Sequence, residues 1–232
     1  MNSKIFNLWE EQTEKRQKHT RLGELLRHHT LVTLIPEDQN KIIDIGCGLG
    51  YLDYLIARQG KDITGVDISL ESLNLFKDIA EEYNIKQIHA NLFDINVNEY
   101  DLVICQEVLE HIEDYESAIM KMNNFIKHNG FGLFCVPYNE NLGAKTIYQP
   151  ETKEYCHKSG HVHSFDYPKL ADSMGKCGFK VLRKKLIANK RVRKIMLNLG
   201  LPINRSTLLL DSVYNYLFPH KASWLAVLGQ KK

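Results

Sequence analysis

The stretch Ile42-Ile43-Asp44-Ile45-Gly46-Cys47-Gly48-Leu49-Gly50-Tyr51-Leu52, written IIDIGCGLGYL, places three glycines at alternate positions directly after an apolar run. In an open parallel sheet, the turn after the first strand is where backbone approaches a ligand, and a β-carbon would block that approach. An ordinary tight turn would explain the glycines equally well if they stood alone. A dinucleotide fingerprint would need its third glycine at Tyr51, so the spacing argues against NAD as the ligand.

Around this stretch, short apolar runs alternate with longer amphipathic stretches. The apolar runs predict buried strands at 42–45, 62–66, 87–90, 102–105, 132–136, 180–188 and 223–228. The amphipathic stretches predict helices at 51–59, 70–83, 115–126 and 167–177. This alternation predicts an α/β fold with a doubly wound, mostly parallel sheet covered on both faces. The pattern of residues 191–218 predicts no definite shape.

Composition narrows the class of protein. The chain has 232 residues, enough for one sizeable core, and its formal charge of +2 gives no overall sign of nucleic-acid binding. Its five cysteines are scattered without a C-x-x-C pair, which fits a reducing compartment. The N-terminus lacks an apolar signal core, and no long apolar run occurs elsewhere. We therefore expect a cytoplasmic protein.

The run GVDIS ends the second predicted strand with Asp67. A carboxylate at this edge of the sheet can accept hydrogen bonds from both hydroxyls of a ribose. Asp67 and Ser69 also suit the cap of the helix that begins near Leu70. Because the two roles concern neighbouring positions, one does not exclude the other.

Four motifs occur in order: DIGCGLG (44–50), GVDIS (65–69), YDLVICQEVLEHIED (100–114) and NGFGLFCVP (129–137). Together they resemble the successive motifs of class I S-adenosylmethionine-dependent methyltransferases, and most closely those of the small-molecule, quinone-biosynthesis-like branch (type 11). The resemblance implies a Rossmann-like sheet of seven strands with an antiparallel last strand. It also implies S-adenosyl-L-methionine as cofactor and S-adenosyl-L-homocysteine as product.

The resemblance implies a set of cofactor-binding residues. These are Asp44, Gly46, Cys47, Gly48 and Gly50 under the methionine and ribose, Asp67 and Ile68 at the ribose, Asn91 and Leu92 at the adenine, and Cys105 and Gln106 at the methionine end. The family often has aspartate where this chain has Asn91, and an asparagine oxygen can accept the same hydrogen bond.

The resemblance also implies a division of the chain. Residues 1–35 are expected to form an N-terminal helical lid, and residues 36–232 the methyltransferase domain with acceptor-site segments at 138–166 and 189–222. In the related branch, an arginine in an R-L-G-type sequence of the lid pairs with the methionine carboxylate. Arg21 precedes Leu22-Gly23 and is the candidate here, although the spacing leaves Arg27 open as well.

Methyl transfer requires alignment and the removal of a proton from a hydroxyl or ammonium acceptor. His161 and His163 are the candidate catalytic bases, because histidine titrates near neutral pH and this segment follows the fifth strand. His111 and Tyr138 are candidate acceptor-site residues, with a structural role as the alternative for His111. Cys156, His157, His161 and His163 crowd into eight residues without a second ligand pair, so we expect no metal site.

The predicted function is methyl transfer to an oxygen or nitrogen atom of a small molecule, with an anionic, lipid-linked or sugar-linked acceptor as candidates. One alternative is an RNA methyltransferase that uses the basic stripe of residues 176–205, although no aromatic residues interleave with its charges. Another is a catalytically silent cofactor-binding partner subunit. The sequence leaves open contact with a membrane surface and a monomer or homodimer state.

Overall fold

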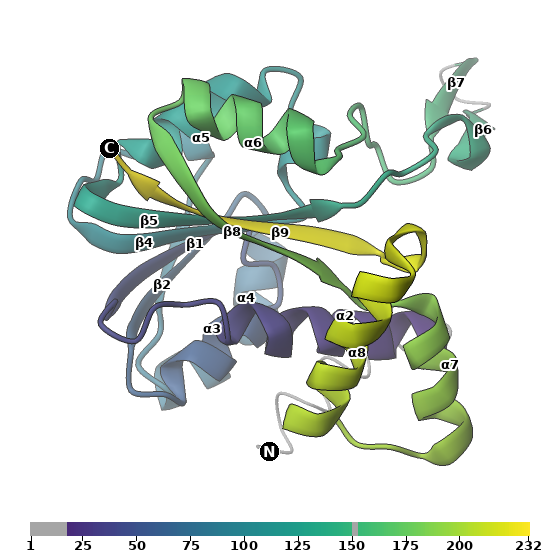
Figure 1. The fold of residues 1–232 in the computed structure, drawn as a ribbon. Helices are drawn as coiled ribbons and strands as arrows, with labels where there is room; N and C mark the ends of the chain where they lie inside the picture. Colours follow the sequence, from purple (N-terminus) through teal and green to yellow (C-terminus); the bar gives the residue numbers. More distant parts are fainter. Residues whose placement is uncertain (1–17, 150–152) are drawn as a thin grey trace.

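The computed structural model describes residues 18–149 and 153–232, so residues 1–17 of the predicted lid lie outside the described part. Seven strands form one sheet in the order β3-β2-β1-β4-β5-β9-β8 (Figure 1). Their bounds are β1 Lys41–Ile45, β2 Asp62–Asp67, β3 Lys86–His89, β4 Tyr100–Gln106, β5 Ile126–Pro137, β8 Phe179–Ile187 and β9 Trp224–Lys231. Every strand predicted from an apolar run is present, which confirms the expected fold class.

The centre of the sheet is β1, which lies parallel to β2 on one side and to β4 on the other. Ile42 and Ile43 point to opposite faces of this strand, and both are fully buried because helices cover both faces. The last strand, β9, is antiparallel to β5 and β8, as the resemblance implied. The chain moves outward from β1 to β3 and then returns to β4, so the strand order reverses between β1 and β4. A crevice is expected at the carboxyl ends of these two strands.

Two layers of helices enclose the sheet (Figure 1). One layer contains α2 Lys18–Val32, α3 Tyr51–Ala57, α4 Leu70–Glu82, α7 Lys190–Leu199 and α8 Arg205–Leu217, and the other contains α5 Tyr115–Asn123 and α6 Tyr167–Lys176. Leu26 and Leu31 bury the apolar side of α2 in the core of the first layer. The described part of the predicted lid therefore packs on the domain as one of its layer helices.

Two segments differ from the sequence expectation. Residues 191–218, for which the sequence predicts no shape, form most of α7 and α8. An unpredicted hairpin of β6 Thr146–Gln149 and β7 Glu154–His157 projects from the domain after β5 (Figure 1). None of the described helices combines the length and the apolar character that crossing a membrane would require.

Candidate functional site

A cleft of about 440 Å³ lies at the carboxyl ends of β1, β2 and β4, where the strand order reverses. Its walls are formed by Ile45, Gly46, Val66, Asp67, Ile68, Ala90, Asn91, Leu92, Phe93, Glu107, Val108, His111 and Ile112. This volume falls within the range of small-molecule sites in proteins. Six of the residues selected from the sequence therefore line one cleft at the carboxyl ends of the strands: Gly46, Asp67, Ile68, Asn91, Leu92 and His111.

The glycine loop connects β1 to α3, and its glycines Gly48 and Gly50 have different surroundings. A β-carbon added to Gly48, whose φ is +55°, would meet no atom within 4 Å. A β-carbon added to Gly50, whose φ is +62°, would lie 2.0 Å from Cε1 of Phe76 on α4. Gly50 thus allows close packing of the loop on α4, whereas Gly48 keeps an open space beside the backbone, as a ligand-binding turn requires.

Asp67 ends β2 and joins the glycine loop to the cleft. One carboxylate oxygen accepts a hydrogen bond from the amide of Gly48 at 2.7 Å, and the other accepts one from the amide of Ser69, also at 2.7 Å. A carboxylate offers about four acceptor positions, so two bonds leave capacity for a ligand hydroxyl pair. The cap of α4 is formed by the Ser69 hydroxyl, which accepts from Ser72, and not by Asp67.

The far wall of the cleft is apolar and exposed. Ile68 is 69% exposed and Phe93 is 46% exposed, unusually open for side chains of this type. Between them, the Asn91 side-chain oxygen accepts a hydrogen bond from the amide of Phe93 at 3.0 Å and so begins a short 3₁₀ turn. Leu92 in this turn is buried. Such an exposed apolar wall could pack against a flat ring, and the backbone groups of the turn lie beside it.

The side chains of Asp44, Cys47, Cys105 and Gln106 are buried beneath the cleft. Burial raises the pKa of Asp44 well above the ordinary carboxyl value, and the neighbouring Asp53 carboxyl raises it further. Burial also raises the pKa of Asp53, to about 7. Asp53 was not selected from the sequence, because on an amphipathic helix an aspartate in the first turn indicates only favourable dipole placement. Asp53 is fully buried on α3 and interacts with the Asp44 carboxyl, but it does not line the cleft.

At the other side of the cleft, an ion pair joins α2 to the residue after β4. Nη1 of Arg27 lies 3.0 Å from a carboxylate oxygen of Glu107, and Glu107 lines the cleft. Glu107 has a φ of +56°, a conformation that side chains other than glycine rarely adopt. Of the two arginines that the sequence left open, Arg27 reaches the cleft wall, and Arg21 lies about two turns earlier on α2.

The segment after β7 brings His161 to the same side. The amide of Val162 donates to the carbonyl of Glu110 at 2.8 Å, which fixes the segment on the short 3₁₀ turn Leu109–His111. As a result the rings of His161 and His111 lie 4.7 Å apart in an edge-to-face arrangement. Nδ1 of His161 contacts a carboxylate oxygen of Glu140, whose side chain is only 5% exposed.

His163 and Tyr138 are placed elsewhere. Nε2 of His163 lies 2.9 Å from the carbonyl of Glu113, and its ring packs on Tyr115. Tyr138 lines a second cavity of about 300 Å³ together with Tyr167 and residues of β8 and α8, and this cavity shares no lining residue with the first. The four acceptor-side candidates thus divide into a pair at the cleft, His111 and His161, and two residues that lie apart from it.

Glu110 is the other functional candidate that sequence reasoning missed. The motif Glu-His at 110–111 was assigned only through its histidine, yet Glu110 is fully buried. Among the described residues, neither of its carboxylate oxygens has a hydrogen-bond partner. Burial, assisted by the charge of Glu107, raises the pKa of Glu110 to about 9. A buried carboxyl group without a donor is rare enough to indicate a special role.

Comparison with known proteins agrees with this geometry. A family model described as a methyltransferase domain matches residues 14–184. The ubiquinone biosynthesis O-methyltransferase of Haemophilus ducreyi is 31% identical over 113 residues, which is 45% of this chain and 48% of that protein. The corresponding protein of Colwellia psychrerythraea is 36% identical over 99 residues, 40% of each chain. The chain thus spans about half the length, or less, of the curated relatives it matches.

Solved structures show the same fold. A magnesium protoporphyrin IX methyltransferase from Synechocystis PCC 6803 with bound SAH has a TM-score of 0.65 and 18% identity, covering 100% of this chain and 95% of that one. An S-adenosylmethionine-dependent methyltransferase from Mesorhizobium loti has a TM-score of 0.63 and 16% identity, covering 88% and 96%. The resemblance drawn from the four sequence motifs is confirmed. The chain belongs to the methyltransferase domain family.

Proposed function

We propose that this chain binds S-adenosylmethionine in the cleft beside Asp67 and transfers its methyl group to a small-molecule acceptor. The observation that carries the proposal is the pairing of Asp67 with the open space at Gly48. A carboxylate with acceptor capacity left lies beside backbone that no side chain covers, at the reversal point of the strand order. The match of the family model to residues 14–184 supports the same activity.

The residues present fit this cofactor. Asp67 would accept the ribose hydroxyls, and the apolar wall of Ile68 and Phe93 would pack against the adenine ring, with Asn91 and Leu92 beside it. Glu107 gives its side of the cleft negative charge, which suits a ligand with a sulfonium and an ammonium group. Arg27 holds Glu107 and would itself be close enough to attract a ligand carboxylate.

Bound S-adenosylmethionine supplies an electrophilic methyl group on a positively charged sulfur. The acceptor atom attacks the methyl carbon in line with the carbon–sulfur bond, whose electron pair stays on sulfur. The proton of the acceptor leaves to a base or to water. The residues of the chain align the two partners and exclude water, and His161 is the candidate base because it reaches the cleft side next to His111.

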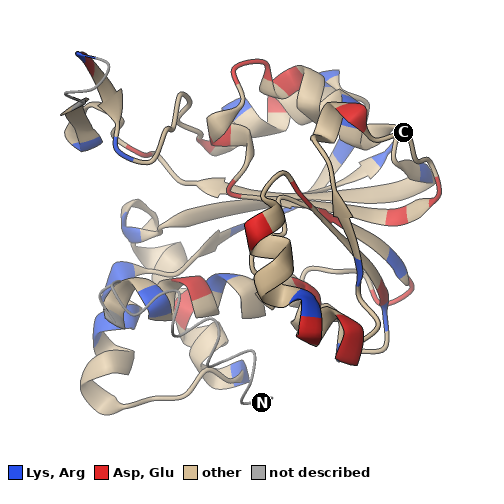
Figure 2. Cartoon of the chain, turned by 180° about the vertical axis from the view of Figure 1, so that it is seen from behind, with Lys and Arg blue, Asp and Glu red and all other residues tan. Residues whose placement is uncertain are grey.

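An oxygen acceptor is the first choice. The curated relatives matched at 31% to 36% identity are named O-methyltransferases. The basic stripe of residues 176–205, which favours RNA or an anionic acceptor, is not one surface. Lys176 ends α6 in one helix layer, while Lys190 and Lys194 lie on α7 in the other. Figure 2 shows Lys and Arg on helices of both layers. No observation therefore favours RNA as the substrate.

Cofactor binding is tested by calorimetric titration with S-adenosylhomocysteine. We expect saturable binding to the wild type and none of comparable strength with NAD. Asp67→Ala should weaken binding by about 1.5–3 kcal/mol, the range for hydrogen bonds to a charged group. Asp62→Ala is the matched control, because Asp62 lies at the amino end of the same strand, away from the cleft. The affinity of this variant for S-adenosylhomocysteine should stay unchanged. Equal affinity of the Asp67 and Asp62 variants would refute the assignment.

Turnover is tested separately with a panel of hydroxylated and amino acceptors. The protein is incubated with S-adenosylmethionine, and mass spectrometry measures the gain of one methylene by the acceptor together with formation of S-adenosylhomocysteine. Tight cofactor binding with no methylation of any acceptor in a cell extract would instead support the catalytically silent partner subunit.

A further inference from the structure

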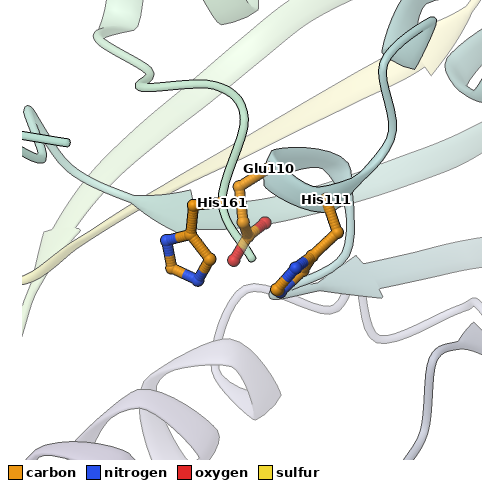
Figure 3. Close-up of side chains that lie close together, drawn as sticks. All are labelled: Glu110, His111 and His161. Carbon is orange, nitrogen blue, oxygen red and sulfur yellow. The ribbon is translucent and has the colours of Figure 1, made fainter. Parts of the chain in front are cut away.

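Three side chains lie close together beside the cleft, and one of them, His111, lines it. Glu110, His111 and His161 each offer a ligand atom, and these atoms lie within 4.8 Å of one another. Figure 3 shows the Glu110 carboxylate between the two imidazole rings. His111 and Glu110 come from the turn after β4, whereas His161 comes from the segment after β7. The sequence predicts no metal site because Cys156, His157, His161 and His163 have no second ligand pair nearby in the chain, whereas this set joins residues 50 positions apart.

The hydrogen bonds of both histidines leave the same nitrogen available. Nδ1 of His111 lies 3.3 Å from the carbonyl of Gly160, and Nδ1 of His161 contacts Glu140. A carbonyl and a carboxylate are acceptors, so each Nδ1 carries the proton and each Nε2 keeps its lone pair. Histidines that bind metals typically donate their other ring N–H to a carboxylate or a backbone carbonyl in this way.

Glu110 supplies the second independent observation. Its side chain is fully buried, and neither oxygen has a hydrogen-bond partner among the residues that the structure describes. Leaving a carboxylate in such a position is costly unless a positive charge compensates it. Arg27, a cation on α2 near this group, is engaged with Glu107.

A second group, Glu140, His157 and His161, also has ligand atoms close together. Its carboxylate is already occupied, since one oxygen contacts Lys145 and the other contacts His161. Nδ1 of His157 accepts the amides of Ser159 and His161 at 3.3 and 3.2 Å. Internal contacts therefore occupy the carboxylate and Nδ1 of His157, while Nε2 of His157 lies 3.7 Å from Glu140. We interpret this group as the support of His161.

We propose that Glu110, His111 and His161 bind a divalent transition-metal cation of the Zn²⁺ or Co²⁺ type. Two imidazole nitrogens and one carboxylate favour such ions over Mg²⁺ and Ca²⁺, which prefer all-oxygen sites. Three protein ligands leave a coordination position open. Ligand atoms around a tetrahedral Zn²⁺ lie about 3.4 Å apart, so a bound cation would draw the three ligand atoms closer together than the 4.8 Å within which they lie here.

The use of the cation rests on the proposed function. His111 lines the cofactor cleft, so a cation bound to it would lie beside the cleft. A cation would lower the pKa of an acceptor hydroxyl bound to it, so the hydroxyl would lose its proton to water more readily. The resulting oxyanion would be the better nucleophile. His161 then acts as a ligand, and the cation takes over the role assigned above to a base.

The test begins with full-length protein stripped of metal by a chelator. Titration with Co²⁺ should produce a visible absorption band that saturates at one cation per chain, and Zn²⁺ should displace the Co²⁺ and abolish the band. Mg²⁺ in moderate excess should not. Absence of a saturable Co²⁺ band, together with no calorimetric signal for Zn²⁺, would overturn the proposal.

Variants distinguish this site from adventitious histidine binding. Glu110→Gln and His161→Gln should each weaken Zn²⁺ binding more than Glu140→Gln, which removes only the support of His161 and should weaken it about 10- to 100-fold. The matched controls are Glu113→Gln, an exposed neighbour of Glu110, and His128→Gln, an exposed histidine at the amino end of β5. Both should bind Zn²⁺ like the wild type. A Glu110→Gln variant with wild-type affinity would contradict the proposal.

Titration of each variant with S-adenosylhomocysteine separates the two proposals and reports folding. Zn²⁺ binding without nucleoside binding would refute the proposed function and leave the cation site standing. Nucleoside binding with no Zn²⁺ binding would refute the cation site and leave the proposed function standing. Methylation that is undiminished after chelation would show that a bound cation has no part in transfer.

Discussion

Gly48 and Gly50 are separated by one residue, and a methyl group at each should have a different effect. Both have positive φ, so alanine costs about 1 kcal/mol at either position. At Gly50 the added carbon would also meet the ring of Phe76, and overpacking of this kind adds about 1–3 kcal/mol. We expect urea unfolding to show a loss of about 1 kcal/mol for Gly48→Ala and about 2–4 kcal/mol for Gly50→Ala.

Gly48→Ala is expected to be the more stable of the two variants, but we expect a clear loss of ligand affinity in it. Gly48→Ala places a methyl group in the open space beside the glycine-loop backbone and should weaken S-adenosylhomocysteine binding although the protein remains folded. If the two variants unfold at the same urea concentration, or if Gly48→Ala binds the nucleoside like the wild type, the separate roles of the two glycines are wrong.

At the scale of residues, the sequence predicted those positions whose function follows from chemical type and order. The glycine spacing and Asp67 belong to this group, because a bare turn and a carboxylate at a strand end are recognisable without coordinates. Glu110 and Asp53 could not be found in this way. Their significance depends on complete burial and, for Glu110, on the absence of a donor among the described residues, which only packing determines. Arg27 is singled out by its ion pair with Glu107 in the cleft wall, which the sequence could not reveal.

At the scale of elements, the side chain of Asn189 connects α7 with α8. Its oxygen accepts from the amide of Arg191 at 3.1 Å and caps α7, and its nitrogen donates to the carbonyls of Tyr214 and Phe218 at the end of α8, each at 3.1 Å. Asn189 is fully buried. We expect Asn189→Ala to lower the free energy of unfolding by about 2–4 kcal/mol, because it removes a cap and leaves the buried side-chain oxygen of Asn215 without the donor that lies 3.1 Å from it.

Asn204 provides the comparison for this prediction. It caps α8 through Thr207 but is exposed, so Asn204→Ala should cost only about 1 kcal/mol. Guanidinium unfolding of both variants measures the difference. Equal losses would show that the contacts of Asn189 with α8 contribute nothing beyond capping.

The strands and most helices followed the period of apolar residues, which is why their positions were predictable. The hairpin of β6 and β7 was not, since much of its length is exposed and no core face imposes an alternation. Within 191–218, basic residues are spread among the apolar positions, and Arg193 is buried between α2 and β9 instead of facing solvent. Tertiary packing, and not local pattern, decides such positions.

At the scale of the whole molecule, Asp44 and Asp53 make stability depend on pH. Both are fully buried, and burial raises the pKa of each above the value expected in the unfolded chain. Between the ordinary carboxyl range and about 7, the folded state therefore holds more protons than the unfolded state. Protons bound preferentially to the folded state stabilise it, so this contribution is lost as the pH rises through that window.

Replacing Asp53 with asparagine should remove much of this dependence. At pH 8 we expect Asp53→Asn to be more stable than the wild type by on the order of 1 kcal/mol or more, because the variant no longer buries the charge that Asp53 carries above its pKa of about 7. At pH 5, below the pKa of about 7 of the buried Asp53 carboxyl, the advantage should shrink. Urea midpoints at the two pH values give the comparison, with the exposed Asp78→Asn on α4 as control. A stability difference between wild type and Asp53→Asn that does not change with pH would mean that the buried pair does not hold its protons in the folded state.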